Sequence, residues 1–176
     1  MARRLIPASD HPTAAATVAG WLVAEWAHLY PDWDLSAATA ELLAVGPGGE
    51  PPMTWLLFDD DITDRDADAQ DAEMQVIGSV GLALDGELGD PVGADEPVSG
   101  IWLVNLFVTP SARRRGHGSA LLDHAITSAR DLGIGDLLLT TEHSAAHYRS
   151  KGWNEIGATS LNGHDSIIMT LASVTR

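Results

Sequence analysis

The sequence contains no cysteine and only one lysine. The absence of cysteine excludes disulfides, thiolate metal sites and a cysteine nucleophile. Ten basic side chains stand against 25 acidic ones, which gives a formal charge of −15. Such a chain lacks the basic footprint that nucleic-acid binding requires, and an anionic membrane would repel it. We therefore expect neither nucleic acid nor a membrane as a partner.

Long apolar runs are also absent. No segment has the length of a membrane span, and the start of the chain has no apolar run typical of a signal peptide. A cytoplasmic location is expected from this. The length of 176 residues predicts one domain over 1–176, and a hydrophobic fraction of 45% is sufficient for a full core despite the acidity.

Hydrophobic periodicity predicts alternating helices and strands. Apolar residues at intervals of three and four predict helices over 11–30, over 36–45 with Ser36 as cap, and over 117–132. Residues 143–150 also look helical. Strand-length apolar runs occupy 53–58, 74–84, 101–108, 137–141, 153–158 and 166–171. The order of 101–108, 117–132 and 137–141 predicts a right-handed crossover between two parallel strands.

Two segments are rich in acidic residues. Segment 59–73 holds eight acidic residues and one arginine, which predicts a solvated, mobile loop, because like charges repel and few apolar groups are available to bury. A calcium loop is the sharper alternative, but its glycine and terminal glutamate spacing is missing. Segment 85–100 reads as a connection rich in glycine, proline and acids.

The loop between the strand at 101–108 and the following helix contains the residues that indicate a binding site most clearly. Gly116 and Gly118 allow a tight turn and close approach of a ligand, and the helix directs unpaired N–H groups at the same place. Arg113, Arg114 and Arg115 add positive charge. The combination predicts an anion site, most naturally for a diphosphate.

This loop resembles the acetyl-coenzyme A motif of the GNAT superfamily of acyltransferases, in which Arg or Gln, two residues, Gly, one residue and Gly or Ala follow one another. Arg113, Gly116 and Gly118 hold these places. Tyr148, with Gly152 and Trp153 behind it, is similar to a second motif of the family and follows in the expected order. The resemblance implies an α/β (α+β) fold with a mixed, mostly antiparallel sheet, splayed at the cofactor strand and flanked by helices on both faces.

The resemblance also implies roles for individual residues. Acetyl-CoA is the implied cosubstrate, Tyr148 the acid that protonates the departing thiolate, and a primary amine of a small molecule or peptide the acceptor. Attack occurs directly in a ternary complex, without a covalent enzyme intermediate. The implied coenzyme-binding residues are Leu106, Phe107, Val108, Arg113, Arg114, Arg115, Gly116, His117, Gly118 and Ser119.

The sequence does not identify a single general base. The glutamate that some members carry on the strand before the loop is missing from 101–108, which leaves Glu142 and His143 as base candidates. Glu25, Trp26 and Asp85 are candidates for the acceptor side. His143 and His147 have the spacing of a zinc pair, but no third ligand is indicated and no metal site is predicted. His28 and His164 carry no pattern.

Two alternatives remain beside the enzyme. The missing strand carboxylate also fits a non-catalytic domain that binds or senses acyl-CoA, and the anion loop alone fits a generic nucleotide-phosphate binder. The sequence names neither the acceptor nor the oligomeric state, although homodimers are common in the family.

Overall fold

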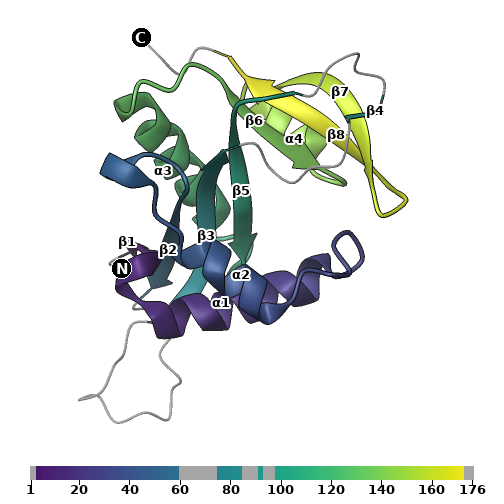
Figure 1. The fold of residues 1–176 in the computed structure, drawn as a ribbon. Coiled ribbons are helices and arrows are strands. Elements are labelled where there is room, and N and C mark those ends of the chain that lie inside the picture. The colour runs from purple at the N-terminus through teal and green to yellow at the C-terminus, as the bar shows by residue number, and fades with distance from the viewer. Residues whose placement is uncertain (1–2, 60–74, 85–90, 93–97, 173–176) are drawn as a thin grey trace, which may run out of the picture.

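One sheet of eight strands organises the described part of the chain. The computed structural model describes residues 3–59, 75–84, 91–92 and 98–172. The strand order is β1-β2-β3-β5-β6-β8-β7-β4 (Figure 1). All pairings are antiparallel except that of β5 with β6. The strands are β1 (Arg3–Pro7), β2 (Met53–Asp59), β3 (Gln75–Leu84), β4 (Pro91–Val92), β5 (Ile101–Val108), β6 (Leu137–Thr141), β7 (Asn154–Leu161) and β8 (His164–Leu171).

Within the described ranges, four α-helices accompany the sheet. They are α1 (Pro12–Trp26), α2 (Leu35–Leu43), α3 (His117–Asp131) and α4 (Ala145–Ser150). Short 3-10 turns occupy Ala8–Asp10, Pro47–Gly49 and Pro110–Ala112. Among the described residues, no helix combines the length and apolar character needed to cross a bilayer.

The alternation of side chains along the strands builds one core on each face of the sheet. In β2, Leu56 and Phe58 pack with α1 and α2, whereas Leu57 packs on the opposite side with α3. Figure 1 shows α1 and α2 crossing one face and α3 lying behind the other. The expected mixed sheet with helices on both faces is confirmed.

The crossover from β5 through α3 to β6 is also confirmed, and its parallel pairing is short. Only Ile101 with Leu137 and Trp102 with Leu138 are in register. Beyond these pairs β5 continues alongside β3 as far as Val108, while β6 pairs with β8. The sheet therefore splays along β5, as Figure 1 shows.

The N-terminal third differs from the predicted elements. The first helix ends at Trp26 rather than at residue 30, and the predicted cap Ser36 lies inside α2. Asp34 is the cap instead, because its Oδ1 accepts a hydrogen bond from the Ala37 N–H at 2.8 Å. β1 was not predicted, since its two apolar residues give no periodic signal and its stability comes from pairing with β2.

Three further boundaries are corrected. Asp59 was assigned to the acidic loop, but it is buried at the end of β2, where it pairs in register with Arg3 and Gln75. Residues 60–73, with the calcium alternative, lie outside the described residues. The connection over 85–100 contains the short β4, which pairs with β7. The last helix begins at Ala145, two residues later than predicted.

The substitution Gly78→Ala tests the close packing between β3 and β5. A Cβ atom at this position would lie 2.5 Å from the Phe107 carbonyl oxygen and 3.2 Å from Leu121 Cδ1. Because a backbone atom cannot move away as a flexible side-chain tip can, we expect Gly78→Ala to lower the free energy of unfolding by about 2 kcal/mol. Chemical denaturation measures this loss.

Gly157→Ala in β7 is the matched control, because its Cβ would meet only Ile168 Cδ1 at an ordinary 3.9 Å. Equal stability of the two variants would contradict the expected clash.

Candidate functional site

A β-bulge shapes the strand that leads to the predicted coenzyme loop. Ser79 pairs with Phe107 and Gly81 with Val104, so two residues of β5 oppose one residue of β3. Asn105, one of these two, has a φ of 55°. The buried Ser79 hydroxyl donates to the Asn105 carbonyl oxygen at 2.8 Å and holds the bulge in place.

The bulge lies where β5 has already separated from β6. Residues 103–108 have no register partner in β6 among the described residues, although β3 still flanks them on the other side. The backbone of Leu106, Phe107 and Val108 therefore presents one open edge. An open strand edge can take up an extended chain through main-chain hydrogen bonds.

The loop after β5 has the conformation of an anion site. Arg113 is extended, whereas Arg114 directly after it has a φ of 63° and Gly116 has a φ of 82°. Such alternation turns successive N–H groups toward one point. α3 begins at His117, and its first N–H groups, which extend to Gly118 and Ser119, have no acceptor within the helix. A Cβ at Gly116 would meet open space.

The loop is tied to the N-terminal part of the chain by its backbone. Arg3 of β1 donates from Nη2 to the Arg115 carbonyl oxygen at 3.0 Å. His117 is buried, with its Nε2 3.5 Å from Asp59 Oδ2 at the end of β2. Burial, together with the positive charge of Arg3, lowers the pKa of His117. Its side chain therefore packs inside as a neutral imidazole, and only its backbone faces the loop.

Arg113 joins three of the predicted site residues. Its Nε donates to the Val108 carbonyl oxygen at 2.9 Å, and its Nη2 lies 3.2 Å from Glu25 Oε1. The guanidinium carbon lies 5.6 Å from the centre of the Phe107 ring, which is a cation–π distance. Glu25, predicted on the acceptor side, is thus engaged by Arg113.

The other two predicted acceptor-side residues have different outcomes. Trp26 is half-buried, with ring centres 6.5 Å from those of both Trp33 and Phe107, so it lies against the strand end. Asp85 lies outside the described residues.

Tyr148 occupies a buried position on α4. Its side chain is 9% exposed and packs with Trp153, whose ring centre is 5.9 Å away. Burial raises the pKa of Tyr148 to about 12, because the phenolate is less well solvated there than the neutral phenol. The hydroxyl is therefore protonated throughout the neutral range, as a proton donor must be.

Glu142 lies at the centre of a histidine cluster just beyond β6. Its Oε2 is 2.9 Å from His28 Nε2, and its Oε1 is 3.3 Å from His164 Nδ1 and 3.4 Å from His143 Nε2. The hydrogen bond from His28 is the main cause of the lowered pKa of Glu142. The Glu142 side chain is 17% exposed, whereas that of His143 is 82% exposed.

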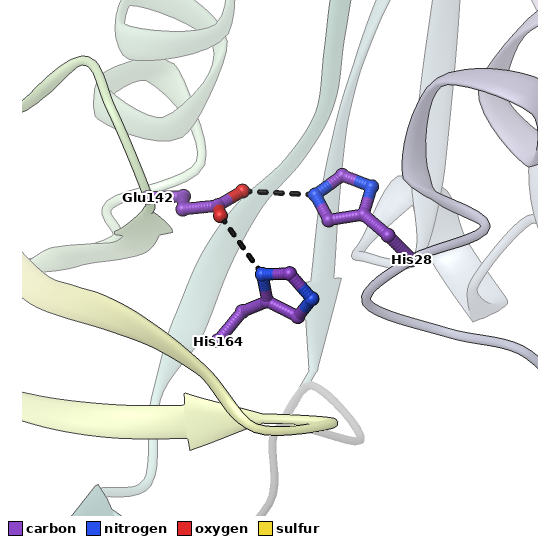
Figure 2. A group of neighbouring side chains, drawn as sticks. All are labelled: His28, Glu142 and His164. Carbon is purple, nitrogen blue, oxygen red and sulfur yellow. Dashed lines mark hydrogen bonds and ion pairs between the residues drawn. The ribbon is translucent and has the colours of Figure 1, made fainter.

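Figure 2 shows Glu142 facing both His28 and His164, which come from separate segments of the chain. One ligand atom of each of these three residues lies within 4.8 Å of the others, a grouping able to hold a metal ion. Of these three residues, only Glu142 was predicted as a site residue, together with its neighbour His143. His28 and His164 lack any local pattern, and only the pairing of distant elements brings them together.

A model for the acetyltransferase (GNAT) family matches residues 23–152. Curated protein sequences give no match. Among solved structures, the chain is similar to an aminoglycoside 6′-N-acetyltransferase complexed with coenzyme A, with a TM-score of 0.64 and 16% identity over 98% of this chain and 97% of that chain.

Two further solved structures are similar. The ribosomal-protein-S18-alanine N-acetyltransferase from Escherichia coli gives a TM-score of 0.60 at 19% identity, over 98% of this chain and 94% of that chain. NAA60 from Arabidopsis thaliana in complex with acetyl-CoA gives a TM-score of 0.60 at 14% identity, over 97% of this chain and 98% of that chain. At these identities the likeness shows a shared fold. The family model spans about three quarters of the 176 residues, so the chain belongs to the GNAT family of acetyltransferases and is an acyltransferase enzyme.

Proposed function

We propose that this enzyme is a cytoplasmic, single-domain N-acetyltransferase that moves an acetyl group from acetyl-CoA to a primary amine of a small molecule or peptide. The observation that carries the proposal is the continuity between the open edge of β5 and the arginine-rich loop at the start of α3. The similar structures support the same chemistry, because one is an aminoglycoside 6′-N-acetyltransferase and another a ribosomal-protein-S18-alanine N-acetyltransferase.

Acetyl-CoA would bind along this continuous surface. The pantetheine arm extends beside Leu106, Phe107 and Val108 and uses the backbone groups that β6 leaves open. The pyrophosphate accepts hydrogen bonds from the N–H groups of residues 114–119, where the start of α3 favours negative charge. Arg114 and Arg115 add charge to this surface, while Arg113 braces the strand end through Val108.

Direct transfer requires three events at the thioester. The neutral amine nitrogen attacks the carbonyl carbon, and a backbone N–H near the bulge in β5 stabilises the oxyanion. The carbon–sulfur bond then breaks, and the departing sulfur takes a proton from the Tyr148 hydroxyl. The amine nitrogen loses its own proton, which leaves an amide and free coenzyme A.

Glu142 is the preferred base for that last proton, directly or through water. It is more enclosed than His143 and lies between the N-terminal and C-terminal parts of the chain, where His28 and His164 approach it. His143 projects into solvent and is the weaker of the two candidates.

A panel of amines tests the reaction as a whole. We expect the purified protein to release thiol from acetyl-CoA in the presence of primary amines such as polyamines, aminoglycosides or peptide amino termini. Thiol release and the mass increase of the acceptor are measured together. Tight binding of acetyl-CoA with no acetylated acceptor across the panel would contradict transfer and favour a binding domain.

Gly118→Asp tests the pyrophosphate site. The new side chain has room, because the nearest atom to a Cβ at this position is Val108 Cγ2 at 4.0 Å. A carboxylate in the first turn of α3 suits the helix dipole, so stability should be kept, but the carboxylate repels the pyrophosphate. We expect the affinity for coenzyme A, measured by calorimetry, to fall at least about 10-fold, which is the factor for 1.4 kcal/mol.

Gly135→Asp is its matched control, since a Cβ there would also meet open space. If both variants bound coenzyme A like the wild type, the pyrophosphate would not lie at the start of α3.

Tyr148→Phe tests the acid. Removal of one positioned proton donor should lower kcat about 100-fold, because the thiolate then leaves without protonation. KM for acetyl-CoA should change little, since the ring and its packing against Trp153 are retained. Steady-state kinetics give both values.

The control is Tyr30→Phe, which changes the other tyrosine of the chain and should keep the kcat of the wild type. An unchanged kcat in Tyr148→Phe would assign the proton to another donor.

A further inference from the structure

We propose that His28, Glu142 and His164 form a binding site for a divalent transition-metal ion of the zinc class. Two imidazoles and one carboxylate are a donor set found in zinc sites that keep one position open. The proposal is independent of the acetyl-transfer chemistry, because it rests on the geometry of these three side chains (Figure 2).

The spacing of the donor atoms fits one ion. Ligand atoms bound tetrahedrally at 2.0–2.1 Å lie about 3.3 Å from one another. Here Glu142 Oε2 lies 2.9 Å from His28 Nε2, and Glu142 Oε1 lies 3.3 Å from His164 Nδ1. The two imidazole rings approach edge to face, with their centres 4.9 Å apart. These two distances end on different Glu142 oxygens, but one donor atom of each residue lies within 4.8 Å of the others, so binding would require the side chains to rotate toward one point.

The backbone on both sides of the cluster is already fixed. Asn162 and Gly163, with φ values of 47° and 81°, form the tight turn between β7 and β8, and His164 follows at once. The Asn162 side chain donates from Nδ2 to the His28 carbonyl oxygen at 2.7 Å. This bond holds the turn against the segment after α1, so two ligands are placed side by side before any ion arrives.

The charge and exposure of the cluster also suit a cation. In the described structure, histidines are the only basic side chains within ion-pair distance of Glu142, and no lysine or arginine approaches it so closely. The side chains of His28 and His164 are 42% and 43% exposed, which leaves the donors accessible to an ion. Imidazole nitrogen favours Zn²⁺, Ni²⁺ or Co²⁺ over Mg²⁺, which prefers oxygen ligands.

Zinc binding by the full chain tests the proposal. After treatment with a chelator and dialysis against Zn²⁺, we expect one Zn²⁺ per chain and a higher Tm, because an ion that joins three segments stabilises only the folded state. Mg²⁺ should not raise the Tm. The variants His28→Gln, Glu142→Gln and His164→Gln should each bind Zn²⁺ at least about 10-fold more weakly and lose the Tm increase.

His147→Gln is the matched control, because it removes the exposed partner of the sequence-based pair with His143 and leaves the three proposed ligands intact. It should bind Zn²⁺ like the wild type. Circular dichroism checks that each variant is folded, and visible absorption of Co²⁺ in the wild type gives a measurement that needs no variant.

The proposal is overturned if the wild type binds neither Zn²⁺ nor Co²⁺ stoichiometrically. It is also overturned if the three ligand variants retain wild-type affinity, or if His147→Gln loses binding while they do not. In those cases the cluster is held by hydrogen bonds alone.

Discussion

The hydrogen bond from the Ser79 hydroxyl to the Asn105 carbonyl is the contact on which the geometry of the site depends. It holds an extra residue in β5, and a bulge of this kind bends a strand and increases its twist. β5 can then remain paired with β3 while it leaves β6 after two residues. Without this separation, the backbone of Leu106 to Val108 would form hydrogen bonds with β6, and no open strand edge would remain for an extended ligand.

The charge distribution complements this geometry. A formal charge of −15 would repel an anionic coenzyme from most of the surface, yet Arg113 to Arg115 stand together at the end of the open strand. A local positive site on an acidic protein concentrates the field where the ligand must arrive. Arg113 also has a structural part, because its bonds to Val108 and Glu25 connect α1 with the strand end.

The parts of the fold that the sequence predicted are those with a local signal. The apolar run of β5, the stripe of α3 and the glycines after Arg115 are each readable within a dozen residues, and all three lie where they were expected. β1 was missed because its stability depends on pairing with the distant strand β2. The cluster around Glu142 was missed because its members come from three separate segments of the chain, with His28 114 residues from Glu142. The cap at Asp34 was missed for a smaller reason. Asp34 and Ser36 are both good caps, and only the backbone decides which of them precedes the helix.

Glu142 has a part in both proposals, so a metal ion and the acceptor amine would compete for its carboxylate. A carboxylate that coordinates a metal ion is a weaker base toward the amine, because the cation stabilises its ionised form. A chain loaded with zinc would therefore transfer the acetyl group more slowly than a chain free of zinc. The same convergence of His28, Glu142 and His164 that encloses the proposed base thus also offers a metal ion three donor groups.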